Sequence, residues 1–326
     1  MRRRGETQTG PDDMTDANEE ISEIADAARR DVDPIMRAGV AAPGWRLPSR
    51  TRLGPVSLQV ADLARSLEYY EMVLGLAPID RTSASAVLGT ADRTTPLVEL
   101  TEKRGVRGTS TRGRLGLYHF AILLPDRPAL GRFIAHLADL HHRFGASDHL
   151  VSEALYLRDP DGLGIEVYAD RPRSTWRTIN SELAMASDPL DLDDIVRSAN
   201  GARWSGMPPG TTMGHVHLHV GDLDQAAAFF HSALGLDKMV WSYPGALFLA
   251  AGGYHHHLGL NTWAGPSAER PTDQDARLLE WRIVLPSPAD AADAANALGR
   301  AGVDAVSDDS AWLAMDPWGT RLRLMS

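Results

Sequence analysis

Three histidines alternate with apolar residues in the stretch from Gly214 to Val220, which reads GHVHLHV. Successive side chains of a β-strand point to opposite faces, so a strand here presents His215, His217 and His219 on one face and buries apolar side chains on the other. A neutral imidazole can bind a metal ion or transfer a proton near pH 7. The stretch therefore predicts a metal-binding or proton-transfer site, against the plainer alternative of an exposed strand with a histidine-rich polar face.

The composition limits the kind of partner that this chain can have. It has 326 residues, of which 43% are hydrophobic, enough for a large core in two domains or one duplicated unit. The formal net charge of −10, from 33 basic and 43 acidic side chains, argues against nucleic acid or an anionic membrane. No apolar run is long enough to span a membrane, and the N-terminus lacks the apolar core of a secretory signal. We expect a cytoplasmic protein, and a homo-oligomer is compatible with this composition.

An internal repeat organises the chain. The pattern Gly-x-Val-x-Leu-x-Val-x-Asp-Leu occurs at residues 54–63 and again, 160 residues later, at residues 214–223. A looser repeat relates Asp-Pro-Asp-Gly at residues 159–162 to Asp-Pro-Trp-Gly at residues 316–319. The repeats predict four modules, each with a strand, a helix and about three more strands, starting near Leu53, Leu117, Met213 and Leu279.

The modules suggest how the chain divides into segments. We expect a flexible leader with a short helix at residues 1–50 and an N-terminal domain, with modules one and two, at 51–172. A linker at residues 173–211 then leads to a C-terminal domain, with modules three and four, at 212–326. Because each module combines a helix with a small sheet, the predicted fold class is α+β.

Matching positions of the modules offer one set of metal ligands. The first strand of module two carries His119 at the position that His215 holds in module three, and the last strand of module two turns Glu166 away from its apolar neighbours. In module four the matching positions carry Glu280 and Arg323, and a guanidinium cannot bind a metal. Because the chain contains no cysteine, histidine and carboxylate must supply the ligands. Two histidines and one carboxylate form the facial triad of non-haem Fe(II) sites, which leaves positions for substrate and O2.

Several segments together resemble a known family. They comprise residues 116–125, 148–156, 159–172, the strand of His215, and residues 252–261. With them the chain resembles the vicinal-oxygen-chelate superfamily, whose proteins are built from βαβββ modules. Within it, the chain is similar to the type I extradiol ring-cleaving dioxygenases, and especially to bacterial catechol 2,3-dioxygenases of the CatE type.

The resemblance implies both a fold and a reaction. The fold is α+β, with four βαβββ modules in two pseudo-duplicated halves, as in glyoxalases, bleomycin-resistance proteins and extradiol dioxygenases. The reaction is extradiol (meta) cleavage of a catechol by O2 at a mononuclear Fe(II), or alternatively Mn(II), held by His119, His215 and Glu166. Modules two and three then share the metal cup, although better-studied relatives commonly pair their last two modules.

The resemblance also implies residues for proton transfer and substrate contact. His256 corresponds to the family's general base for the catechol proton, which later acts as an acid. Tyr156 lies ten residues before Glu166, as the family's tyrosine lies before its carboxylate ligand, and His149 is a further candidate for contact with substrate or O2. Three more histidines, His217, His219 and His255, are candidates for orienting ligands or substrate. The plainer alternative is a polar patch with hydrogen-bonded histidines and an ordinary strand tyrosine.

Two other functions stay open at the level of the sequence. One is a metal-dependent glyoxalase or epimerase of the same fold, which needs no O2 and usually has two carboxylate ligands. The other is a non-catalytic protein that binds an aromatic ligand between apolar walls. The His–His–Glu set favours the dioxygenase over both, but it does not identify the substituent on the catechol.

Overall fold

The computed structural model describes residues 38–110 and 112–326. The helix expected near Ile21 in the leader lies outside these residues. In the part of the chain that is described, no helix is both long and apolar enough to cross a membrane.

Four βαβββ modules build the described chain, so the predicted α+β fold is confirmed. Each of the first strands, β2 (Val56–Val60), β6 (Gly116–Leu123), β12 (Thr212–His219) and β16 (Arg277–Val284), is followed by a helical segment and three further strands. The helices are α2 (Leu63–Met72), α3 (Arg127–Asp139) and α6 (Pro288–Arg300); in module three, α5 (Leu223–Ala226) continues as the π-helix η3 (Ala227–Ala233).

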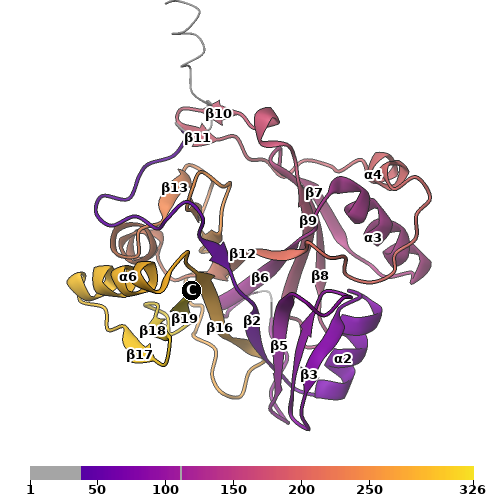
Figure 1. Cartoon of the computed structure of the whole chain (residues 1–326), viewed down its shortest axis with the longest axis horizontal. Coiled ribbons are helices and arrows are strands. Elements are labelled where there is room, and N and C mark those ends of the chain that lie inside the picture. Colours follow the sequence, from indigo (N-terminus) through magenta and orange to yellow (C-terminus); the bar gives the residue numbers. More distant parts are fainter. Residues whose placement is uncertain (1–37, 111) are drawn as a thin grey trace, which may run out of the picture. The chain divides into compact units, whose positions relative to one another are not determined.

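Modules two and three share one eight-stranded sheet, in the order β13-β14-β15-β12-β6-β9-β8-β7. Its remaining strands are β7 (Gly145–Asp148), β8 (Ser152–Arg158), β9 (Gly164–Asp170), β13 (Asp237–Val240), β14 (Ala246–Ala250) and β15 (Leu258–Asn261). At its centre β12 runs antiparallel to β6, with His217 opposite His119 (Figure 1). This is the pairing of modules that the resemblance implied.

Modules one and four form the second sheet, in the order β17-β18-β19-β16-β2-β5-β4-β3. Its other strands are β3 (Ala77–Arg81), β4 (Ser85–Gly89), β5 (Pro96–Glu102), β17 (Val306–Asp308), β18 (Ala311–Met315) and β19 (Arg321–Met325), and the short β1 (Arg52–Leu53) pairs with β16. Each sheet therefore joins a module from before residues 173–211 to one from after them. The domain boundaries at residues 172 and 212 stay a prediction.

The helical segment of each module begins at a capping side chain. Asp62, Asp126, Asp222 and Ser287 are the N-caps of the four modules, and each side chain accepts a hydrogen bond from the backbone N–H three residues later. In the histidine strand, the apolar side chains of Val216, Leu218 and Val220 are fully buried in the core. The alternation read from the sequence thus sets which face of β12 carries the histidines.

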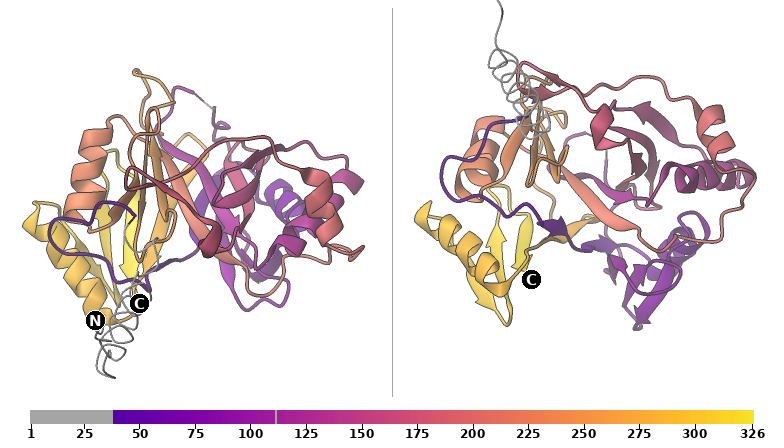
Figure 2. Two further views of the ribbon diagram at one scale, coloured as in Figure 1. Left: turned by 90° about the horizontal axis from the view of Figure 1, so that it is seen from above. Right: turned by 45° about the horizontal axis from the view of Figure 1, so that its top comes forward.

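The segments outside the modules also pack against the fold. In the predicted leader, Leu47 is buried and its N–H donates to Gly235 O, while Val40 forms an antiparallel β-bridge with Lys238 of β13. The linker contains η2 (Arg173–Thr175), β10 (Thr178–Ile179), β11 (Glu182–Leu183) and α4 (Leu192–Ser198), and α4 packs against α3 (Figure 2). The described part of the leader and the linker are therefore part of the ordered structure.

Candidate metal centre and active site

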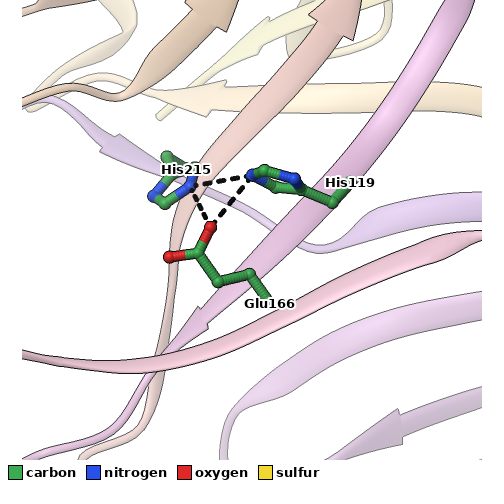
Figure 3. A group of neighbouring side chains, drawn as sticks. All are labelled: His119, Glu166 and His215. Atoms are coloured by element: carbon green, nitrogen blue, oxygen red, sulfur yellow. Dashed lines mark hydrogen bonds and ion pairs between the residues drawn. The ribbon is translucent and has the colours of Figure 1, made fainter. Parts of the chain in front are cut away.

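Three side chains from three strands meet in the sheet of modules two and three. His119 on β6 and His215 on β12 place their Nε2 atoms 3.0 Å and 3.1 Å from Oε2 of Glu166 on β9, and 3.3 Å from each other (Figure 3). All three are at most 5% exposed. In the described part of the chain, these three residues are the one group of histidine and acidic side chains that lie close enough together to hold a metal ion.

The spacing between strand and helix explains how the two histidines come together. His119 lies seven residues before the N-cap Asp126, and His215 lies seven residues before the N-cap Asp222. The two side chains therefore occupy equivalent positions on neighbouring antiparallel strands. Glu166 joins them because β9 runs parallel to β6 on its other side, with Glu166 beside Ala121.

The distances among the three donor atoms fit the ligands of a single metal ion. Metal–ligand bonds of about 2.1 Å place neighbouring ligands about 3.0 Å apart in an octahedron and about 3.4 Å apart in a tetrahedron. Both distances from the histidines to Glu166 are close to the octahedral edge, and the 3.3 Å between the two histidine nitrogens is close to the tetrahedral edge. The three side chains therefore fit the ligands of one metal ion.

The charges in this cluster also suit a metal site. Burial lowers the pKa of His119 and of His215, so both imidazoles are neutral at pH 7 and keep a lone pair for a metal. Burial opposes ionisation of Glu166, but the two imidazoles outweigh it and hold its pKa well below the usual range. Nδ1 of His215 is buried without a hydrogen-bond partner in the described part of the chain, and the ring stacks on His256, with centroids 4.1 Å apart.

Modules one and four have no such cluster among the described residues. The positions seven residues before their N-caps carry Pro55 and Glu280. Glu99 on β5 holds the position of Glu166, but Arg282 binds both of its carboxylate oxygens, at 2.5 Å and 2.6 Å. Glu280 is paired with Arg282 and with Arg323. Ion pairs therefore occupy the place that the metal ligands occupy in the other sheet.

A cavity of about 180 Å³ opens beside the three ligands. Its walls contain Tyr118, Ser147, His149, Tyr156, Met185, Ala186, Ser187, His217, Tyr243, Phe248, His256 and Trp263 in addition to the ligands. Glu166 is the one carboxylate among these lining residues, and no lysine or arginine is among them. The cavity is thus mostly aromatic and apolar, with a few histidines, as is usual for small-ligand sites.

Tyr156 and His149 lie together on one wall. Tyr156 on β8 is the direct cross-strand neighbour of Glu166, which explains the ten-residue spacing. Nδ1 of His149 is 2.6 Å from Ala186 O, so this nitrogen is the donor and Nε2 accepts the hydrogen bond of the Tyr156 hydroxyl. Burial and the charge of Glu166 raise the pKa of Tyr156 well above its usual value, so the hydroxyl stays protonated.

His256 lines the cavity, but not as part of a strand. Residues 255–257 form the bend before β15. His255 lies outside the cavity wall, and its Nδ1 is 2.7 Å from Nδ1 of His256. Burial lowers the pKa of His256 well below the usual value, with the neighbouring histidines adding to the effect. Its ring is therefore a neutral group facing the cavity.

His217 and His219 are both hydrogen-bonded to Asn261, a residue that the sequence did not reveal. Asn261 on β15 lies opposite His219, and its Oδ1 is 2.6 Å from Nδ1 of His219, while its Nδ2 donates to Nε2 of His217 at 2.9 Å. His217 lines the cavity, but His219 does not. Gly259 lies opposite His217, and a Cβ there would come within 2.8 Å of the ring.

The linker supplies part of the cavity wall, which the sequence also did not reveal. Met185, Ala186 and Ser187 lie there, and Ser187 Oγ is 3.2 Å from the hydroxyl of Tyr243. No repeat or motif marks these residues, because the linker has no counterpart elsewhere in the chain. Only the folding of the chain brings these three residues to the site.

The chain is similar to known proteins in its sequence. The profile of the Glyoxalase/Bleomycin resistance protein/Dioxygenase superfamily matches residues 52–167 and 212–312. Catechol-2,3-dioxygenase of Bacillus subtilis (strain 168) is 42% identical over 270 residues, which cover 82% of this chain and 94% of that protein.

Two solved structures share the fold. One is a candidate dioxygenase from Bacillus subtilis, with 13% identity, coverage of 86% of both chains and a TM-score of 0.59. The other is glyoxalase I from Zea mays, with 20% identity, coverage of 84% of this chain and 92% of that chain, and a TM-score of 0.50. At these identities, both show a similar fold and no more.

Proposed function

Because the chain belongs to the Glyoxalase/Bleomycin resistance protein/Dioxygenase superfamily, we propose that it cleaves a catechol ring beside its two hydroxyls with O2. The observation that carries this proposal is the meeting of His119, Glu166 and His215 at the edge of an aromatic cavity. The relationship to a catechol-2,3-dioxygenase over most of the chain supports it. Fe(II) is the proposed metal and Mn(II) the alternative, since both accept this ligand set.

The three ligands would bind the metal on one side and leave the side toward the cavity open. Bound there, the metal supplies Lewis acidity, which lowers the pKa of the diol, and brings the diol and O2 into one coordination sphere. The neutral imidazoles of His119 and His215 and the ionised Glu166 give this set a charge of −1. A divalent cation and a singly ionised catechol together neutralise it, which favours binding in a buried site.

His256 is the proposed acid–base residue. Its ring faces the cavity next to His215, and its neutral form can accept the proton that the second hydroxyl of the diol releases. The Tyr156 hydroxyl donates its proton to Nε2 of His149, which leaves its oxygen free to accept a hydrogen bond from a hydroxyl of the diol. His217 and Trp263 form another part of the wall, with ring centroids 5.7 Å apart.

The cavity favours a catechol that has a single ring and no charged substituent. A cavity of 150 Å³ with apolar walls is known to hold benzene, so 180 Å³ suits one ring and a small substituent rather than a biphenyl. A carboxylate on the substrate would find no lysine or arginine among the lining residues. Burying that charge unpaired would be unfavourable. Catechol and methylcatechols are therefore the proposed substrate class.

Ring-cleavage assays test the reaction. Protein loaded anaerobically with Fe(II) is mixed with air-saturated catechol, 3-methylcatechol, 2,3-dihydroxybiphenyl or 3,4-dihydroxyphenylacetate. We expect a yellow semialdehyde of the 2-hydroxymuconate kind, one O2 consumed per ring, and the highest kcat/KM for the first two compounds. Protein with one iron per chain that forms no yellow product and consumes no O2 with any of them would refute the proposal.

Matched variants test the residues. Glu166→Gln should lose iron, whereas Glu99→Gln, the same change at the equivalent position of module one, should keep it. His215→Ala should also lose iron. His256→Ala should keep iron but lose turnover by about 10²- to 10⁴-fold, as expected for a general acid–base residue. Iron bound equally by the two glutamine variants would contradict the proposed ligand set.

The other functions considered from the sequence receive less support from the site. A glyoxalase or epimerase with two carboxylate ligands would need a second acid near the metal, and Glu166 is the one carboxylate among the lining residues. A protein that binds only an aromatic ligand has no use for a buried glutamate between two imidazoles, because an uncompensated carboxylate costs free energy. Glyoxalase activity is checked in the same preparations with a hemithioacetal substrate.

A further inference from the structure

A chain of hydrogen-bonding groups lies behind His256. Nδ1 of His256 is 2.7 Å from Nδ1 of His255, and Nε2 of His255 is 2.9 Å from Oδ1 of Asp170, the last residue of β9. His255 is fully buried, whereas the Asp170 side chain is 28% exposed. The three groups therefore connect the cavity wall to the protein surface.

The chemistry of each group fixes which atom carries the proton. An ionised carboxylate only accepts hydrogen bonds, so Nε2 of His255 must be the donor to Asp170. When the ring of His255 is neutral, its Nδ1 then has only a lone pair and accepts from His256. His256 consequently carries its proton on Nδ1. Its other nitrogen, Nε2, is left as a bare lone pair, and it makes no hydrogen bond in the part of the chain that the structure describes.

We propose that Asp170 and His255 are positioning residues that hold His256 in the form with a bare Nε2. This inference rests on the proposed function, because that form of the ring is the one able to take the diol proton. The opposite tautomer would present an N–H to the cavity and could not act as a base. A carboxylate that sets the tautomer of a catalytic histidine is a known device in hydrolases, but here a second histidine stands between the two groups.

The surroundings of the two residues hold this arrangement in place. The ring of Tyr254 packs on His255, with centroids 4.1 Å apart, and its hydroxyl lies 3.3 Å from Oδ1 of Asp170 and 2.7 Å from the hydroxyl of Tyr168. Trp176 packs against the same imidazole at 5.4 Å. Gly214 leaves room for Tyr168, since a Cβ there would collide with the hydroxyl. His255 is thus fixed on several sides.

The tautomer can be measured directly in the metal-free protein, without any turnover. Two- and three-bond proton–nitrogen correlation spectra of protein labelled with ¹⁵N-histidine distinguish a protonated from a bare ring nitrogen, and the signals lost in His256→Gln assign His256. We expect His256 of the unaltered protein to be protonated on Nδ1. A proton on Nε2 instead would overturn the inference, whatever the enzyme does with catechol.

Variants of Asp170 then connect the tautomer to catalysis. Asp170→Ala removes the acceptor and should shift protonation of His256 toward Nε2, with a fall in kcat of about 10- to 100-fold and little change in KM or iron content. Asp170→Glu keeps a carboxylate and should restore much of both. Asp194→Ala, which removes an exposed acid on α4, is the control and should change neither. An Asp170→Ala protein with an unchanged tautomer and kcat would show that Asp170 has no positioning role.

The outcomes separate this inference from the proposed function. If the iron-loaded protein cleaves no catechol, the proposed function fails, while the spectra of the metal-free protein still report the tautomer. If catechol is cleaved and Asp170→Ala changes neither tautomer nor kcat, only the positioning role fails.

Discussion

Asp159 gives a quantitative prediction about the turn that leads into the strand of Glu166. Its Oδ1 accepts hydrogen bonds from the N–H groups of Asp161 and Leu163, at 2.9 Å and 2.8 Å, and its Oδ2 lies 3.3 Å from the hydroxyl of Tyr70. Burial, with a contribution from the charge of Asp161, raises the pKa of Asp159 from 3.8 to about 7. This carboxyl therefore titrates near neutral pH in the folded protein.

The direction of the pH effect follows from this shift. The folded state favours the protonated form of the Asp159 carboxyl. The resulting stabilisation of the folded protein is fully present below pH 3.8 and is lost as the pH rises through about 7. At 1.36 kcal/mol for each pKa unit, the full loss is about 4 kcal/mol. Of this, about 3 kcal/mol falls between pH 5 and pH 8.

The substitution Asp159→Asn tests the reasoning, because asparagine keeps an acceptor oxygen for the turn but never ionises. Relative to the unaltered protein, the free energy of unfolding of the variant should rise by about 3 kcal/mol between pH 5 and pH 8. Urea unfolding followed by tryptophan fluorescence measures both proteins at each pH. Asp316, which accepts from Trp318 and Thr320 in the equivalent turn of module four, has a raised pKa, so Asp316→Asn should change in the same direction. Parallel stability curves for Asp159→Asn and the unaltered protein would refute the argument.

Two further predictions concern the ion-paired sheet and the size of the cavity. Arg282→Ala should lower the free energy of unfolding by about 3 kcal/mol, because it leaves Glu99 and Glu280 without their shared partner. The iron content of this variant should stay at one per chain. Loss of iron would show that the second sheet takes part in metal binding. Met185→Ala should enlarge the cavity and raise kcat/KM for 2,3-dihydroxybiphenyl relative to catechol by about tenfold, the usual value of one or two methylene groups in an apolar pocket. An unchanged ratio in competition assays would show that Met185 does not limit substrate size.

The sequence predicted those features that a few neighbouring residues or an exact repeat encode. The alternation in β12 set its buried face, and the repeated Asp-Leu pair placed Asp62 and Asp222 at the starts of two helices. Because modules repeat in register, the sequence also placed His119 and His215 at equivalent positions. The repeat thus predicted which side chains the fold would bring together.

The tertiary structure alone decided what surrounds those side chains. Asn261 contacts two histidines because β15 pairs with β12, and Asp170 contacts His255 across 85 residues of chain. Met185 reaches the cavity because the linker crosses it, and no periodicity encodes that path. The ring positions at residues 255–257 depend on a bend that precedes β15 and not on a strand ladder.

The physical reason for this division is the range of the interactions. Caps, turns and face alternation depend on hydrogen bonds and burial within one element, so their sequence patterns are local and repeat with the module. Which strands pair and which loop covers the site depends on the summed packing of distant segments. For this chain, the sequence by itself determined the proposed ligands His119, Glu166 and His215, and the folded structure determined the groups that surround them and enclose the cavity.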